Sequence, residues 1–239
     1  MVVSITSVSQ EQLKNEKGKI MPLSQEFIVN RTRCTVSVQL QIAPTWVWSG
    51  KTVAEWETDL VNCNTRLEAM FKAEAKMKAR RGKVEAAMED LHEVTVVYLT
   101  LLKTLQRKDA AHLELLGPLS ASGGSRNGIL DEAADLQSAW EEIDAEWEPR
   151  PGEMLADFIL QIEDCAKAKT DFTKATTAWR NRASELRVFL EEVNGDCVAW
   201  YAAATVVFPE DTAQGGVIRG LVPTTYVPSS QPAPTEMAA

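Results

Sequence analysis

Apolar residues recur every seven positions along residues 53–105, which is the longest regular pattern in the chain. One row of this pattern is apolar in every heptad, and the other row is interrupted only at Glu74, Arg81 and Thr95. No proline falls in the stretch, and Gly82 is its only glycine. A heptad pattern of this length is typical of a coiled-coil helix. We therefore predict a helix over residues 53–105.

The same pattern returns 102 positions later, over residues 155–207. Several residues are identical at this offset, including the pairs Cys63/Cys165 and Arg80/Arg182. The recurrence favours an internal duplication. The alternative is two independent helices that share a heptad register.

The two predicted helices need a packing partner, because a narrow apolar stripe is buried only against another stripe. We expect an antiparallel hairpin in which the numbers of facing residues sum to about 260. This register places Cys63 opposite Cys197 and Arg81 opposite Trp179. The alternative is that each helix bends, near Gly82 and near Asn194-Gly195, into a compact four-helix bundle.

Residues 33–42 show a different pattern, in which apolar and polar residues alternate. Cys34, Val36, Val38, Leu40 and Ile42 are separated by single polar residues. Strict alternation predicts a strand with one apolar face. We therefore expect a small N-terminal β element within residues 1–50, ended by Ala43-Pro44.

A shorter amphipathic helix is predicted between the two copies, over residues 129–147, after a glycine- and serine-rich loop at 120–128. Trp140 and Trp147 lie on its apolar stripe. We expect these tryptophans to pack on the long helices of the same chain or of a neighbour. The other face is acidic, with Asp131, Glu132, Asp135, Glu141, Glu142, Asp144 and Glu146.

Each long helix is followed by a polar corner and a short apolar segment, which we expect to fold back as a cap. The first contains Leu113, Leu115 and Leu116, and the second contains Val217, Ile218 and Leu221. From Pro223 the chain is rich in proline, threonine and serine, which is typical of an extended tail. The predicted fold is mainly α, with segments 1–50, 51–118, 119–150, 151–222 and 223–239.

This order of a long charged helix, a polar corner and a short leucine-rich segment occurs twice. Together with the closing run from Val207 to Arg219 and Val222-Pro-Thr-Thr, it is similar to bacterial tandem helical-hairpin proteins of unknown function. The similarity covers residues 50–226. It implies a helical hairpin fold and no activity.

Composition and charge narrow the range of partners. The net charge of −9 disfavours general nucleic-acid binding. No stretch reaches 18 apolar residues, so a membrane-spanning helix is not expected. The N-terminus shows no secretory signal, which makes the cytoplasm the default location and leaves surface or virion assembly open.

Six basic residues gather in the middle of the first long helix, and we call them the basic belt: Lys72, Lys76, Lys78, Arg80, Arg81 and Lys83. The second copy echoes them with Lys167, Lys169, Lys174, Arg180 and Arg182. We interpret the belt as a docking surface for acidic groups. A solvated helix face is the alternative.

The sequence offers little catalytic chemistry. Glu89-x-x-His92 has the spacing of a di-iron ligand pair in a helical bundle, but the second copy has Glu191-x-x-Asn194 instead. The four cysteines form no Cys-x-x-Cys pair, and no phosphate-binding loop or nucleophile motif is present. We therefore predict no catalytic residues, no metal and no cofactor.

These observations favour a non-enzymatic structural protein that self-associates into a filament, tube or shell. The predicted contact residues are Trp46, Trp48, Trp140, Trp147 and the basic belt. One alternative is a monomeric helical adaptor. Another is a helical pore-former that uses the apolar stretches 94–102 and 197–208.

Overall fold

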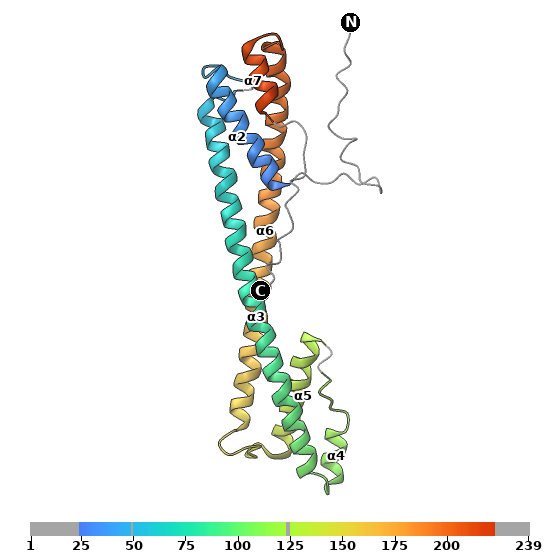
Figure 1. The fold of residues 1–239 in the computed structure, drawn as a ribbon. Coiled ribbons are helices and arrows are strands. Elements are labelled where there is room, and N and C mark those ends of the chain that lie inside the picture. The colour runs from blue at the N-terminus through green and yellow to red at the C-terminus, as the bar shows by residue number, and fades with distance from the viewer. Residues whose placement is uncertain (1–23, 49, 123–124, 223–239) are drawn as a thin grey trace, which may run out of the picture. The chain divides into compact units, whose positions relative to one another are not determined.

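The computed structural model describes residues 24–48, 50–122 and 125–222. Six helices lie in this part of the chain, and no strand beyond two isolated bridges does (Figure 1). The mainly helical prediction is therefore confirmed. The predicted tail 223–239 and the first 23 residues lie outside the described residues. The helices are α2 (Gln25–Ile42), α3 (Val53–Leu105), α4 (Ala110–Leu116), α5 (Arg126–Asp144), α6 (Leu155–Val207) and α7 (Ala213–Leu221).

The long helices α3 and α6 match the predicted pattern closely. Each has 53 residues, and both their first and their last residues are 102 positions apart. Neither helix breaks at Gly82 or at Asn194-Gly195. A single glycine costs a helix only about 1 kcal/mol, which strong helix formers on either side offset. The bent alternative is therefore wrong.

Helix α2 replaces the predicted N-terminal strand, so the expected β element at residues 33–42 is wrong. Its buried residues include Ile28, Thr32, Thr35 and Gln39, which are three or four positions apart. Because three of these four residues are polar, the spacing of apolar residues alone did not show the helical period. The Ser24 hydroxyl caps the helix by accepting the Phe27 N–H at 3.1 Å.

The repeat extends to the helices that precede α3 and α6. The N-caps of α2 and α5, Ser24 and Ser125, are 101 positions apart. Each of these two helices is followed by an isolated bridge, Trp48–Lys51 after α2 and Arg150–Glu153 after α5, and the two bridges are 102 positions apart. Gly50 and Gly152 sit inside these turns with φ of 79° and 81°, values that favour glycine. Within the described residues, the helices thus follow the same order twice, as α2–α3–α4 and α5–α6–α7.

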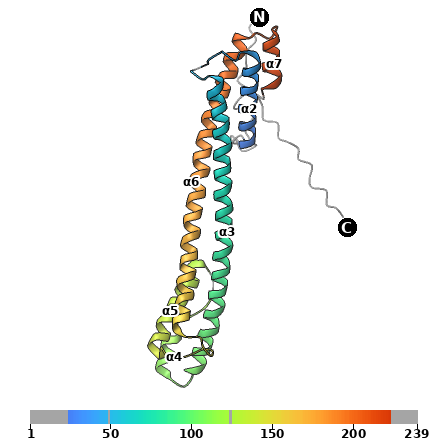
Figure 2. The ribbon, with the colours of Figure 1, turned by 90° about the vertical axis from the view of Figure 1, so that its left-hand side faces the viewer.

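The compact units of the fold do not follow the repeats. The first unit combines Met1–Ala69 with Ala183–Ala239, and the second is Met70–Arg182. The first therefore contains α2, α7 and one part each of α3 and α6 (Figure 2). The second contains α4, α5 and the remaining parts of the two long helices. The segments predicted from the sequence follow chain order, whereas each unit draws on both repeats.

In the second unit, the parts of α3 and α6 run antiparallel. Met88 lies against Cys165, with sulfur atoms 3.3 Å apart, and the Tyr98 and Phe158 rings lie 5.5 Å apart. In the predicted register, Met88 would lie opposite Phe172. The observed register is therefore one heptad away, a shift that keeps apolar layers in contact.

This shift overturns the predicted pair of Arg81 with Trp179, which lies in the second unit. In the observed register Arg81 lies opposite Phe172, and its guanidinium pairs with Glu85 of the same helix at 2.8 Å. Cys197 lies against α2, with its sulfur 3.7 Å from the Thr32 hydroxyl, and Cys63 and Cys197 are both free. Burial raises the pKa of the Cys63 thiol to about 11.

The short helices cap the long ones, as predicted. Leu116 of α4 and Ile218 of α7 are fully buried. Helix α4 contacts α5, and α7 contacts α2. A side chain at Gly215 would place its first carbon 2.0 Å from the Pro209 carbonyl oxygen. The return of α7 therefore requires glycine at this position.

Candidate interaction surfaces

An aromatic cluster holds α5 in the second unit. Trp140 is fully buried, with its ring 5.4 Å from Tyr98, 5.9 Å from Phe158 and 5.1 Å from Trp147. Such tilted and edge-on contacts are favourable for aromatic pairs. The predicted packing of this helix through its tryptophans is confirmed within the same chain. Complete burial leaves Trp140 no surface for a second chain.

The other two predicted contact tryptophans lie in the first unit, in the segment between α2 and α3. The Trp46 ring lies 6.2 Å from Trp48, 6.1 Å from Trp200 and 5.8 Å from Phe208. Trp46 and Trp48 are half-buried. Each residue is therefore partly exposed, and a contact with another copy stays a prediction.

The buried face of α2 is unusually polar, a feature that the sequence analysis missed. Gln39 is fully buried, and its amide N–H donates to the Trp46 carbonyl at 2.6 Å. Its amide oxygen has no hydrogen-bond partner among the described residues, nor have the indole N–H groups of Trp56 and Trp200. Buried polar atoms are normally paired. Helix α2 is thus held by a less favourable interface than an apolar helix would be.

Arg31 strengthens this polar attachment. Only 6% of it is exposed, and its guanidinium donates to the Asn194 side-chain oxygen of α6 at 2.7 Å. The same group lies over the Phe27 ring, 4.7 Å from its centroid. Burial lowers the pKa of Arg31. These contacts tie α2 to α6 through a charged group.

Lys51 links the turn before α3 to both long helices. Its ammonium group donates to Asp59 of α3 at 2.6 Å and to Asp196 of α6, and it lies over the Trp56 ring. Burial alone would lower the pKa of Lys51. The hydrogen bonds to the two carboxylates outweigh burial and raise this pKa. Lys51 therefore remains a cation that holds two acidic side chains.

All residues of the basic belt lie in the second unit, and several are paired locally. Lys78 pairs with Glu74 at 2.7 Å, and Arg80 pairs with Asp171 of α6 at 3.0 Å. Residues 70–85 and 165–182 together contain eleven Lys and Arg but three Asp and Glu, a net charge of +8. A strongly positive surface therefore stands on a chain whose net charge is −9. Such a local field favours acidic partners.

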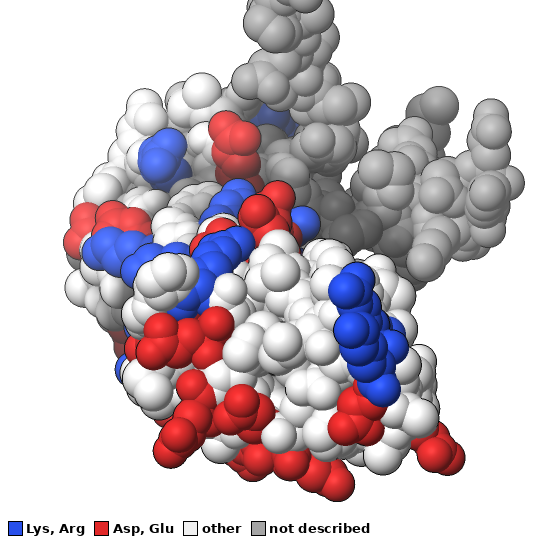
Figure 3. Space-filling model, turned by 90° about the horizontal axis from the view of Figure 1, so that it is seen from below, with Lys and Arg blue, Asp and Glu red and all other residues white. Residues whose placement is uncertain are grey.

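Helix α5 contacts the long helices through a basic residue at its first turn. Arg126 of α5 pairs with Glu85 of α3 at 2.7 Å, and its guanidinium lies over the Phe172 ring. Arg81 also bonds Glu85, and the two cations lower the pKa of that carboxyl. The acidic face of α5 is largely exposed. Figure 3, which is seen from below the view of Figure 1, shows acidic side chains along its lower edge.

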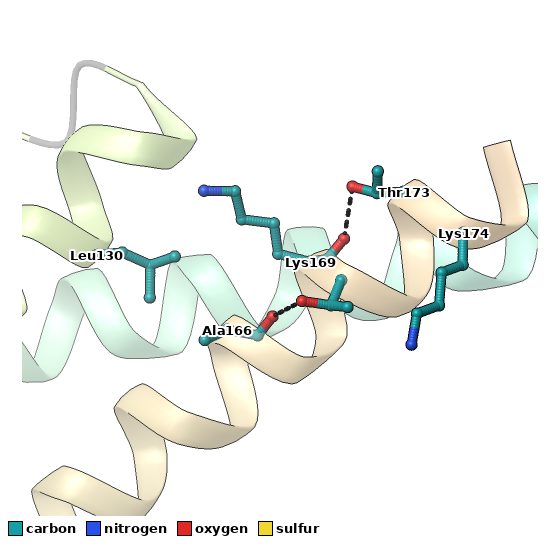
Figure 4. A pocket seen from close by; sticks show the side chains of 6 residues that line it. Leu130, Ala166, Lys169, Thr173 and Lys174 are labelled. Carbon is teal, nitrogen blue, oxygen red and sulfur yellow. Dashed lines mark hydrogen bonds between the residues drawn. The ribbon is translucent and has the colours of Figure 1, made fainter. Parts of the chain in front are cut away.

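A shallow hollow of about 460 Å³ lies between α5 and α6 (Figure 4). The Thr170 and Thr173 hydroxyls donate to backbone carbonyls of α6, at 3.0 and 2.9 Å. Lys169 extends towards α5 in Figure 4. The hollow therefore offers ammonium groups but no nucleophile or acid–base pair. Its lining residues are Leu130, Ala166, Lys169, Thr170, Thr173 and Lys174.

Two further findings concern metals and membranes. Among the described residues, no group of three His, Cys, Asp or Glu side chains is placed to hold a metal ion. No described helix combines the length and the apolar character that a membrane crossing requires.

Comparison of the chain with protein-family models, with curated proteins and with solved structures gives no match.

Proposed function

We propose that the chain is a non-enzymatic structural protein that associates with copies of itself. In this proposal, α3 and α6 form an antiparallel coiled coil, and their outer faces provide the contacts between copies. The half-buried Trp46 and Trp48 and the basic belt are further contact residues in this proposal.

One observation carries this proposal, namely that apolar side chains are exposed at equivalent positions of both repeats. Val96 and Leu105 of α3 are 37% and 53% exposed. Their equivalents 102 positions later, Val198 and Val207 of α6, are 45% and 52% exposed. A single exposed apolar residue is ordinary on a protein surface. Exposure of apolar side chains at the same two positions in both repeats indicates surfaces that another molecule covers.

The surroundings of these residues suit helix contacts. Residues 94–102 and 197–208 contain no charged side chain. Ala199 and Ala202 are exposed beside Val198. Small side chains allow two helix backbones to approach closely. The opposite face of each stretch is anchored in its own core by Tyr98 or Trp200, both buried.

The test is the mass and shape of the full-length protein, by light scattering and negative-stain microscopy over a range of concentrations. We expect particles far heavier than the 26.4 kDa chain. Replacing Val198 and Val207 with glutamate should lower that mass. Val61→Glu is the matched control, because Val61 is 62% exposed and its equivalent, Glu163, is already acidic. A monomer at every concentration would contradict the proposal and favour the adaptor alternative.

A further inference from the structure

Three lysines of the basic belt form a stripe along one side of α3. Lys72, Lys76 and Lys83 are exposed. Residues four and eleven positions apart lie within about 40° of one another around an α-helix. Ala79, also exposed, fills the remaining position of the stripe, seven residues after Lys72. Lys76 and Lys83 make no ion pair with any residue that the structure describes.

Helix α5 carries an acidic stripe with the same spacing. Asp131, Asp135 and Glu142 are exposed, again four and eleven positions apart, and Ser138 fills the position seven residues after Asp131. Within the described part of the chain, none of these three carboxylates has an ion pair. The two stripes thus match in charge, in spacing and in the small residue between the charges.

The acidic stripe faces away from the core of its own unit. The buried residues of α5 are Ala133, Leu136, Ala139 and Trp140. On a helix with about 3.6 residues per turn, they lie on the side opposite to Asp131 and Asp135. A basic helix that covers the acidic stripe therefore comes from another molecule.

We propose that the lysine stripe of one chain docks on the acidic stripe of α5 in a second copy of the chain. If the two helices run parallel, three pairs form: Lys72 with Asp131, Lys76 with Asp135, and Lys83 with Glu142. Ala79 then faces Ser138, which permits the helix separation of about 8–10 Å found in packed pairs. Exposed ion pairs are individually weak, so their main effect is to fix the partner and the register.

This contact joins two different surfaces, so each chain offers one stripe of each kind. Such head-to-tail contacts build an open chain of subunits, or a ring where the rotation closes. The inference rests on the proposed function and adds a direction of growth to it. The positions equivalent to Lys76 and Lys83 are Ala178 and Glu185, so the stripe is not repeated on α6.

Two charge-reversed forms of the full-length chain test the contact. One carries Lys72→Glu, Lys76→Glu and Lys83→Glu, and the other carries Asp131→Lys, Asp135→Lys and Glu142→Lys. We expect each form alone to assemble at least tenfold less than the wild type, since like charges then meet. An equimolar mixture should restore assembly, because every contact between the two forms again pairs opposite charges. Circular dichroism checks that each form keeps its helical content.

The matched control carries Lys167→Glu, Lys174→Glu and Arg180→Glu. It changes the net charge as much as the lysine-stripe form does, at other exposed basic residues of the second unit. We expect it to assemble like the wild type. Raising the salt from about 0.1 M to 1 M, which shortens the screening length from about 10 Å to 3 Å, should weaken wild-type assembly.

The outcomes separate the two proposals. If the wild type assembles and either reversed form assembles equally well, the stripe contact is wrong and the proposed function stands. The stripe contact is also overturned if the control variant loses as much assembly as the reversed forms, or if the equimolar mixture does not assemble. A wild type that stays monomeric overturns both proposals. A monomer that binds a single-stranded oligonucleotide through the lysine stripe would identify a polyanion as the occupant instead.

Discussion

Gln39 of α2 and Trp140 of α5 occupy equivalent positions, 101 residues apart, and both are fully buried. Trp140 packs against Tyr98 and Phe158. The positions equivalent to these two rings are Trp200 and Trp56. In the first unit the large indole rings therefore come from α3 and α6, and α2 contributes an amide. In the second unit α5 itself contributes a large ring.

This difference predicts that α2 unfolds locally, or detaches from its unit, more often than α5 does. An interface with Thr32, Thr35 and Gln39 gains less from burial than one with Ala133, Leu136 and Trp140. In native-state hydrogen exchange, the amides of Gln25–Ile42 should exchange faster than those of Arg126–Asp144. Equal protection of the two helices would contradict this expectation.

Trp140 should be the most sensitive position of the second unit. Trp140→Ala removes a fully buried ring and should lower the free energy of unfolding by about 3–5 kcal/mol. Trp147→Ala is the matched control, since Trp147 is only half-buried, and it should cost clearly less. Urea unfolding followed by circular dichroism measures both. A similar loss for the two variants would show that Trp140 is not the anchor of α5.

Lys51→Met should destabilise the first unit by about 1 kcal/mol at neutral pH, because it leaves Asp59 and Asp196 without their shared cation. Since Lys51 is partly exposed, solvent screens much of this interaction. Lys51→Arg keeps the charge and should lose less. Thermal unfolding of the two variants beside the wild type measures the difference, and an unchanged midpoint for Lys51→Met would refute the linking role.

Tyr98 should make the protein sensitive to alkaline pH. Burial, together with the hydrogen bond that its hydroxyl donates to Glu153 at 2.7 Å, raises its pKa from 10.0 to about 12. Between these values the folded chain keeps a proton that the unfolded chain loses. Tyr98 therefore adds stability below pH 10, and this stability is lost as the pH rises towards 12.

The Tyr98→Phe variant isolates this effect. At neutral pH it should be less stable than the wild type by about 1 kcal/mol, because the hydrogen bond is lost. Between pH 10 and 12 the wild type should lose up to about 2–3 kcal/mol more than the variant does. Chemical unfolding at several pH values measures both curves. Parallel curves would show that another group controls the alkaline transition.

Much of the fold follows from the heptad pattern. It predicted the limits of both long helices, because a strictly repeated apolar row has few alternatives. The caps around Leu116 and Ile218 were also predicted correctly. The register of α3 against α6 was predicted incorrectly. A shift of one heptad keeps Met88 in an apolar layer, because either Phe172 or Cys165 can face it.

The error at residues 33–42 has a physical cause. Alternating β-branched residues such as Val36 and Val38 resemble a strand. The helical period lies in Thr32, Thr35 and Gln39, whose burial no apolar pattern could reveal. Comparing the region with its equivalent in α5, 101 residues later, would have supplied the missing signal. The basic belt was identified, but the spacing that matches its lysines to the acids of α5 was not.

The two turns with Gly50 and Gly152 mark where the chain enters each long helix. Each compact unit contains only one of these entries, and it completes itself with the far part of the other copy. The segment that recurs along the chain and the segment that packs as a compact unit therefore differ. One repeat alone lacks the parts of the other repeat against which its two ends pack. A cut between residues 122 and 125 should therefore leave two fragments that stay bound to each other, because each unit contains a part of both fragments.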